Sequence, residues 1–246
     1  MKVITFGEEK APYISSFEEF FEVPHLLKVL NTEYCYSEVF DENIIDLACY
    51  NAYFPMSDKI AADKWALILR LHKERCIIDF SNFKVSKKIK KLASKYTLTF
   101  NKDFDKCIEM INNRYDDSWL SKPLINCFKT MRDSPNKYST QFCSFELWDN
   151  DETLVAGEVG FIVGSCYSSL SGFHTISNTG HIQLYLSSIF LKDNGFSFWD
   201  MGMELDYKIK LGGKVLNEFD FFDKYKNTRD IDLNFKSLEK TVLENN

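Results

Sequence analysis

The spacing of apolar residues divides the amino-terminal third of the chain into short elements. Helical spacing recurs over residues 17–30 and 42–51, whereas residues 65–71 and 76–80 are apolar runs of the length typical of strands. Short helices mixed with short strands indicate a small α/β module. We therefore expect residues 1–80 to form an N-terminal α/β domain.

The rest of the chain, residues 81–246, shows a clearer succession of elements. Ser86 is placed to cap a helix in which Ile89, Leu92 and Tyr96 recur at near-helical spacing. After it the pattern predicts a strand at 96–100, helices at 104–113 and 123–133, strands at 141–148, 154–163 and 165–171, a helix at 180–194 and a strand at 196–200. Gly195 stands where the last helix should end, and a polar tail begins near residue 226. This order predicts an α/β (α+β) fold of the acyltransferase kind.

Composition and charge narrow the classes of function. The net charge of −6 argues against a basic surface for long duplex DNA, although it leaves room for a local basic patch that meets RNA. The seven cysteines include no CxxC pair, so a disulfide framework or zinc site is not indicated and a reducing compartment is expected. The first residues lack a signal-peptide pattern, and the apolar runs fall far short of the roughly 20 residues of a membrane-spanning helix. These features predict a cytoplasmic protein that binds neither membrane nor DNA.

A cluster of lysines on the helix after Ser86 is the first candidate site. It comprises Lys87, Lys88, Lys90, Lys91 and Lys95, with Lys84 just ahead. Such a cluster can neutralise several phosphates, but it is equally typical of a solvated helix face.

Trp119, in a polar loop around residues 116–119, and Phe128, on the next helix, are candidate platforms for stacking a base. The alternative for both rings is a place in the core.

Two acids stand among apolar residues. Asp200 ends the apolar run Phe198-Trp199, and Glu158 lies within Val155-Ala156-Gly157-Glu158-Val159. A buried carboxylate is costly unless it holds something positive, so each acid is either exposed or part of a site.

The four histidines show no metal-binding spacing, and the phosphate-binding patterns GxxxxGK[ST] and GxGxxG are absent. No metal or other cofactor is therefore expected.

Several segments, in one order and spacing, together resemble a single family. They are Tyr53-Phe54-Pro55-Met56, Arg75-Cys76-Ile77-Ile78, Ser86-Lys87-Lys88-Ile89-Lys90-Lys91, Ser118-Trp119-Leu120, Ser144-Phe145-Glu146-Leu147-Trp148, Leu154-Val155-Ala156-Gly157, Ser171-Gly172-Phe173, Trp199-Asp200 and Leu211-Gly212. Over about residues 48–222 the chain is similar to the leucyl/phenylalanyl-tRNA-protein transferases. The first 45 residues match that family poorly.

The resemblance implies an enzyme that moves an amino acid from aminoacyl-tRNA to the free amino terminus of a protein and so marks that protein for degradation. It also implies a small N-terminal domain followed by a GNAT-like acyltransferase domain with a mixed, largely antiparallel sheet. Trp119 and Phe128 match the aromatic residues that hold the terminal adenosine. The residues that fall on or beside the family's tRNA-binding helix are Lys84, Lys87, Lys88, Lys90 and Lys91.

Asp200 matches the Asp of the family's aliphatic-Asp-Cys-Gln segment. Because an aminoacyl ester is already activated, the reaction needs no ATP and no metal, only an amine aligned with the ester carbonyl. We expect Asp200 to orient that amine and to handle its proton, the alternative being an Asp that caps a turn. Gly202 and Leu170 stand where the family has a Gln and a Glu, so a hydrogen-bond network of the family is incomplete in this chain.

This sequence also differs from the family in the pocket that accepts Leu or Phe in the family. Glu158 and Gly172 each replace a Met and Ser187 replaces a Phe, with Phe173 beside them. An ionised Glu in an apolar pocket needs a cation to compensate it. We therefore expect a larger, negatively charged pocket that takes Arg or Lys, unless Glu158 points to the other face of its strand.

The acceptor and two other classes of function are left open by the sequence. By the logic of arginylation, an arginyl transferase would act on proteins or peptides with acidic amino termini. The first alternative is a GNAT enzyme that uses a thioester such as acetyl-CoA, although residues 173–179 lack the usual pyrophosphate loop. The second is a tRNA-binding module without catalytic activity.

Overall fold

The computed structural model describes residues 1–6, 9–114, 118–134 and 136–233, and the chain separates into two compact units. One comprises Met1–Lys73 and Asp117–Gln141, and the other Glu74–Asp116 and Phe142–Asn246. The predicted domains, 1–80 and 81–246, differ from these units in two respects. The division falls after Lys73, because the strand that follows pairs in the second unit's sheet, and the chain later returns to the first unit.

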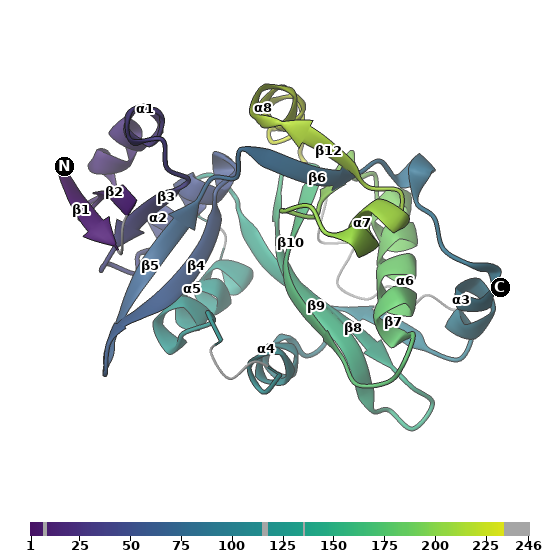
Figure 1. The fold of residues 1–246 in the computed structure, drawn as a ribbon. Coiled ribbons are helices and arrows are strands. Elements are labelled where there is room, and N and C mark those ends of the chain that lie inside the picture. The colour runs from purple at the N-terminus through teal and green to yellow at the C-terminus, as the bar shows by residue number, and fades with distance from the viewer. Residues whose placement is uncertain (7–8, 115–117, 135, 234–246) are drawn as a thin grey trace. The chain divides into compact units, whose positions relative to one another are not determined.

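The first unit is built on a sheet whose described strands follow the order β1-β2-β3-β5-β4 (Figure 1). The strands are β1 (Lys2–Phe6), β2 (Glu9–Tyr13), β3 (Tyr34–Ser37), β4 (Phe54–Ala61) and β5 (Lys64–Arg70). The helices are η1 (Glu18–Glu22), α1 (Val23–Leu30), α2 (Glu42–Tyr50) and α5 (Lys122–Asp133). The helical patterns at 17–30 and 42–51 and the strand at 65–71 are thus confirmed. Asp41 starts α2 by accepting hydrogen bonds from the N–H groups of Asn43 and Ile44.

The second unit carries a sheet in the order β12-β6-β11-β10-β9-β8-β7, as far as the chain is described. Its strands are β6 (Glu74–Ile78), β7 (Thr97–Phe100), β8 (Gln141–Trp148), β9 (Leu154–Val163), β10 (Cys166–His174), β11 (Phe198–Asp200) and β12 (Lys214–Asn217). The helices are η2 (Phe80–Asn82), α3 (Lys87–Ala93), α4 (Phe104–Asn112), α6 (Thr179–Asp193), α7 (Asp206–Lys210) and α8 (Glu218–Lys226). The β10–β11 pair is parallel, whereas β7–β8, β9–β10, β6–β11 and β6–β12 are antiparallel. This confirms the α/β class and the mixed, largely antiparallel sheet.

Local signals explain where the elements of the second unit begin and end. The Ser86 hydroxyl accepts from the N–H of Ile89 at 3.3 Å and caps α3 as expected. Gly195, with a φ of 82°, ends α6 in the left-handed region that favours glycine. The predicted polar tail lies mostly in residues 234–246, outside the described residues.

The core of the second unit forms where α6 lies along one face of the sheet while α4 lies along the other (Figure 1). Ile182, Leu186 and Phe190 of α6 are buried there with Tyr167 and Trp199 of the sheet. Each of these side chains removes a large apolar surface from water. The α6 face of the central strands is therefore fixed by packing.

Strands β10 and β11 part soon after they meet. They pair only at Cys166↔Phe198, Tyr167↔Trp199 and Ser168↔Asp200, although β10 continues to His174. The register of β10 against β9 also shifts between Ser169 and Ser171, which is the mark of a β-bulge. Bulges and strand ends re-aim side chains, so this region departs from a regular ladder.

Candidate active site

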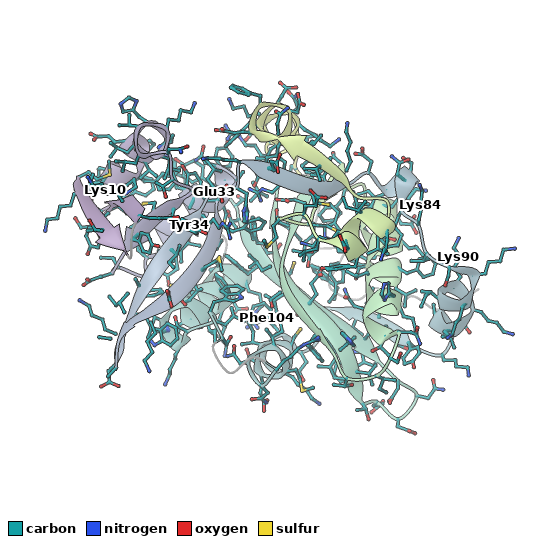
Figure 2. All side chains as sticks on the ribbon, viewed as in Figure 1. Lys10, Glu33, Tyr34, Lys84, Lys90 and Phe104 are labelled. Carbon is teal, nitrogen blue, oxygen red and sulfur yellow. The ribbon has the colours of Figure 1, made fainter. Side chains whose placement is uncertain are left out.

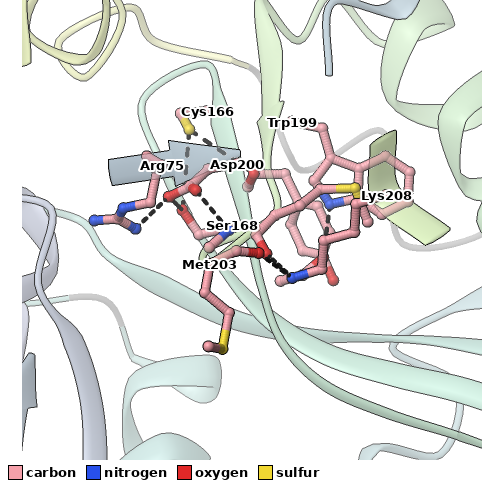
Figure 3. Close-up of polar contacts among 11 residues, drawn as sticks. Arg75, Cys166, Ser168, Trp199, Asp200, Met203 and Lys208 are labelled. Carbon is pink, nitrogen blue, oxygen red and sulfur yellow. Dashed lines mark hydrogen bonds and ion pairs between the residues drawn. The ribbon is translucent and has the colours of Figure 1, made fainter. Parts of the chain in front are cut away.

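A buried acid, Asp200, stands at the end of β11 with only 1% of its surface exposed. Its Oδ2 accepts a hydrogen bond from Arg75 Nη1 at 2.8 Å and another from the Ser168 hydroxyl at 3.1 Å (Figure 3). Its Oδ1 accepts from the backbone N–H of Gly202 at 2.9 Å. The Arg75 Cζ lies 4.5 Å from the centroid of the Phe221 ring. Arg75, Ser168 and Gly202 therefore surround the Asp200 carboxylate in a nearly dry cluster.

The electrostatics of this cluster favour a charged pair. Burial raises the pKa of the Asp200 carboxyl, and the Arg75 guanidinium, the Gly202 N–H and the Ser168 hydroxyl oppose that rise. A guanidinium at 2.8 Å and two further donors stabilise the carboxylate over the neutral acid. Removing either member of such a pair leaves a buried charge without compensation. The Asp200 carboxylate is thus engaged by the protein itself and presents almost no surface to an incoming amine.

The three residues after β11 make a turn whose backbone is held from two sides. Gly202 has a φ of 73°, in the left-handed region that favours glycine. The Met201 N–H donates to the Cys76 carbonyl at 2.9 Å, and the Cys76 N–H donates to the Gly202 carbonyl at 2.7 Å. From α7, Lys208 Nζ donates to the carbonyls of Met201 and Met203, the latter at 2.9 Å (Figure 3). The turn is therefore fixed by β6 and by a buried lysine.

A second acid, Glu158 of β9, lies on the opposite face of the sheet, because successive residues of a strand alternate between faces. The Tyr167 hydroxyl donates to Glu158 Oε1 at 2.7 Å. The Ser169 hydroxyl also interacts with the carboxyl and itself accepts from Trp199 Nε1 at 2.7 Å. Burial raises the pKa of Glu158 to about 7, while Tyr167, Ser169 and the charge of Lys208 lower it. The carboxyl therefore changes its charge close to neutral pH.

The residues predicted to line the donor pocket with Glu158 occupy different surroundings. Gly172 pairs directly with Glu158 across β9 and β10, and a Cβ at Gly172 would lie 3.5 Å from the Glu158 Cβ. Ser187 on α6 is fully buried, and its hydroxyl accepts from Gln183 Nε2 at 2.9 Å. Phe173 is also buried. The structure thus brings Gly172 to Glu158, whereas the pocket roles of Ser187 and Phe173 stay predictions.

The lysines of the predicted tRNA-binding surface all lie in solvent. Ile89 and Ala93 anchor α3 in the core, which turns the lysines outward. The exposed residues are Lys84, Lys87, Lys88, Lys90, Lys91 and Lys95, of which Figure 2 labels Lys84 and Lys90. We call this set the α3 lysine surface. It offers several positive charges to phosphates, and its role in tRNA binding stays a prediction.

The two predicted stacking rings belong to the first unit and differ in exposure. Trp119 is half-buried, and its backbone carbonyl accepts a hydrogen bond from the Ser57 hydroxyl. Phe128 on α5 has no exposed surface, so stacking on a base would require this ring to move. Residues 115–117, which include part of the predicted polar loop, lie outside the described residues.

Three side chains of the site were missed by the sequence reasoning. Arg75 borders an apolar run, which is a signal for a buried charge, whereas Ser168 and Lys208 carry no signal that separates them from surface residues. Among the described residues, no group of three or more His, Cys, Asp and Glu side chains is arranged to hold a metal ion. None of the described helices is long and apolar enough to span a bilayer.

Comparisons with known proteins give one consistent family. The family model described as leucyl/phenylalanyl-tRNA protein transferase matches residues 77–226, a range that contains both Glu158 and Asp200. A leucyl/phenylalanyl-tRNA–protein transferase of Legionella pneumophila (strain Lens) is 25% identical over 158 residues, which are 63% of this chain and 68% of that protein. The corresponding enzyme of Vibrio campbellii is 26% identical over 174 residues, covering 69% and 71% of the two chains.

Solved structures resemble the chain more distantly. FemX has a TM-score of 0.46 at 10% identity, over 87% of this chain and 81% of that one. L-PGS from Bacillus licheniformis has a TM-score of 0.43 at 12% identity, over 91% and 76%. A GCN5-related glucosamine N-acetyltransferase region of a fungal β-N-acetylglucosaminidase has a TM-score of 0.41 at 10% identity, over 88% and 30%.

Proposed function

The chain belongs to the leucyl/phenylalanyl-tRNA–protein transferase family of tRNA-dependent aminoacyltransferases, and we propose that it transfers an amino acid from aminoacyl-tRNA to the N-terminal α-amine of an acceptor protein. The observation that carries the proposal is the family match over residues 77–226, which spans the α3 lysine surface from Lys84 onward and the strands of both buried acids. An aminoacyl ester brings its own activation, so the chain needs to supply binding, alignment and charge stabilisation.

The α3 lysine surface is the proposed contact with the tRNA acceptor arm. Its lysines are exposed, and they lie on the short helix α3 and within three residues of its two ends. Such a surface contributes affinity without reading sequence, and its contribution falls with salt. Trp119, which is half-buried, is the proposed platform for the terminal adenosine.

The proposed role of Asp200 is narrower than the one expected from the sequence. Its carboxylate already accepts from Arg75, Ser168 and the Gly202 N–H. With only 1% of its surface exposed, Asp200 presents almost no surface for a direct contact with the attacking amine. We therefore propose that Asp200 acts as a positioning residue, which holds the Ser168 hydroxyl and the turn at Gly202 where β10 and β11 part.

Glu158 is the basis of the proposed donor specificity for Arg or Lys. Its carboxyl is buried, and no cation of the described residues lies within ion-pair distance of it. A guanidinium or ammonium from the donor would stabilise the charged form and would be held by it in turn. A second candidate, a neutral donor such as Leu or Phe, is favoured by one observation: Tyr167, Ser169 and Lys208 already stabilise the Glu158 carboxylate in part.

The test of both donors is a transfer assay with purified protein. tRNAs charged with Arg, Lys, Leu or Phe are offered together with a peptide that has a free acidic amino terminus, and the N-acetylated peptide is the control. Transfer of Arg or Lys that falls in Glu158→Met, with transfer of Leu or Phe unchanged or increased, supports the basic donor. Transfer of Leu or Phe without Arg or Lys overturns it.

The same assay separates the other classes of function. Acetylation of the peptide from acetyl-CoA would indicate a thioester-dependent acyltransferase, and tRNA binding without transfer from any donor would indicate a binding module. The proposed place of action is the cytoplasm, where charged tRNA is made, and all seven cysteines are free thiols in keeping with a reducing compartment. We also propose that transfer tags the acceptor for degradation, with acidic amino termini as acceptors.

A further inference from the structure

Lys208 is a lysine that folding removes from water. It is 6% exposed and is the one buried lysine among the described residues. Burial lowers its pKa, whereas the neighbouring Cys76, Asp200 and Glu158 raise it. Fixing a long side chain and desolvating an ammonium are both costly, so a buried lysine has to be compensated by what surrounds it.

The contacts of Lys208 hold one segment of backbone. Its Nζ donates to the carbonyls of Met201 and Met203, on either side of Gly202. An ammonium has three N–H donors, so two of them are used for these carbonyls. The Gly202 N–H donates to Asp200 Oδ1, and the Gly202 carbonyl accepts from the Cys76 N–H. The turn is therefore held by β6, by Asp200 and by Lys208 (Figure 3).

The charge of Lys208 also acts on both acids of the site. It favours the ionised form of Asp200 on one face of the sheet and of Glu158 on the other. Asp200 has Arg75 as its ion-pair partner at 2.8 Å. Glu158 has the hydroxyl of Tyr167 and that of Ser169, and Lys208 supplies the positive charge that acts on it. The charge of Lys208 thus acts on both clusters, while its hydrogen bonds are made to the carbonyls of Met201 and Met203.

We propose that Lys208 is a positioning residue for aminoacyl transfer: its ammonium fixes the carbonyls of Met201 and Met203 at the turn after β11, and its positive charge acts on Asp200 and Glu158. This inference rests on the proposed transferase function. Removal of the ammonium would free the turn and leave Glu158 with neutral donors alone. Both effects reach the region where β10 and β11 part, without any contact between Lys208 and the tRNA body being needed.

Three variants separate the two parts of this role. Lys208→Met removes the charge and the hydrogen bonds, Lys208→Gln keeps N–H donors without charge, and Lys208→Arg keeps the charge. Lys210→Met, an exposed position on the same helix, is the matched control. Single-turnover transfer is measured against pH, tRNA affinity is measured separately, and the Glu158 carboxyl is titrated by NMR in protein labelled at glutamate.

The NMR titration of Glu158 has to be separated from the titration of the groups around Lys208 and Glu158. Those that act on Lys208 are Cys76, Asp200, Glu158 and Arg75, and those linked to Glu158 are Tyr167, Cys107, Cys143 and Lys208. Assignment of the Glu158 signal comes from its loss in Glu158→Gln. Since a positive charge favours the carboxylate, its removal should raise the pKa of Glu158.

The expected result is a loss of about tenfold or more in the transfer rate of Lys208→Met, with tRNA affinity within about twofold of wild type. The acid limb of its pH–rate profile should move to higher pH, Lys208→Arg should restore most of the rate, and Lys208→Gln should restore less.

A Lys208→Met protein that matches Lys210→Met in rate and pH profile overturns the proposal. If Lys208→Met does not fold, the Gln and Arg variants decide it by the same comparison. A wild-type protein that transfers no amino acid overturns the transferase function instead, and an unshifted Glu158 titration in Lys208→Gln then overturns the charge role of Lys208.

Discussion

Arg75 Nη1 lies 2.8 Å from Asp200 Oδ2, and each side chain is only 1% exposed. The pair joins β6 to β11 within the sheet of the second unit, and Ser168 and the Gly202 N–H complete the shell of donors around the carboxylate. A buried pair of this kind is weak evidence for net stability, but breaking it is costly. The geometry at the end of β11 therefore depends on the pairing of β6 with β11.

Single substitutions of this pair should be severe. Arg75→Met or Asp200→Asn should each lower the free energy of unfolding by about 3–5 kcal/mol, because each leaves a partner buried without its counter-charge or full set of contacts. The double variant should lose clearly less than the sum of the two, and denaturant unfolding measures the difference. Arg70→Met is the control: its partly exposed pair with Glu33 should contribute no more than about 1 kcal/mol. Additive losses would contradict the assigned coupling.

A Cβ at Gly202 should destabilise the turn after β11. With φ at 73°, Gly202→Ala places an L side chain in the left-handed region at a cost of about 1–2 kcal/mol. Gly180→Ala, in the first turn of α6, meets its nearest atom at an ordinary 3.4 Å and should be neutral or stabilising. Thermal unfolding of the two variants compares them directly, and equal melting temperatures would show that the turn is not constrained as described.

The elements of the second unit were predictable wherever a local signal coincided with periodicity. Ser86 caps α3 and Gly195 ends α6 at the places where the sequence pattern changes. Such signals act between residues close in sequence, so they can be read without knowing the fold. The strand β4 shows the limit, because its outer half, with Asp58 and Lys59 exposed, lacks the apolar run of a strand.

The site itself was only half predictable. Asp200 and Glu158 could be singled out because a carboxylate among apolar residues is costly wherever the chain goes. Their partners follow from the order of the strands: Arg75 is 125 residues from Asp200 in sequence and meets it only because β6 lies beside β11. The same holds for Lys208, whose burial depends on where the short helix α7 packs.

The α3 lysine surface gives a salt-dependent prediction for tRNA binding. The triple variant Lys87→Ala, Lys90→Ala and Lys91→Ala should bind tRNA more weakly, and each lost phosphate contact should reduce the slope of log K against log salt by about 0.7–0.9. Affinity is measured by filter binding over a series of salt concentrations. Lys10→Ala, an exposed lysine of the first unit, is the control and should reduce the slope by less than the triple variant does. A weaker affinity with an unchanged slope would mean that these lysines do not neutralise phosphates.

Glu158 makes a prediction about stability and pH whose sign follows from burial. Burial raises its pKa in the folded protein from an ordinary 4.5 to about 7, so the folded state binds its proton more tightly than the unfolded state does. The stability that this gives is fully present below about pH 4.5 and is lost as the pH rises to about 7, to an extent of roughly 3 kcal/mol.

Glu158→Gln carries no such charge. Its free energy of unfolding relative to wild type should therefore rise between these two pH values and level off above them. Urea unfolding over a pH series measures the trend, with Glu109→Gln on the exposed face of α4 as the matched control. A flat difference for Glu158→Gln would show that the carboxyl is solvated in solution, and would remove the basis for a cation-binding role at this position.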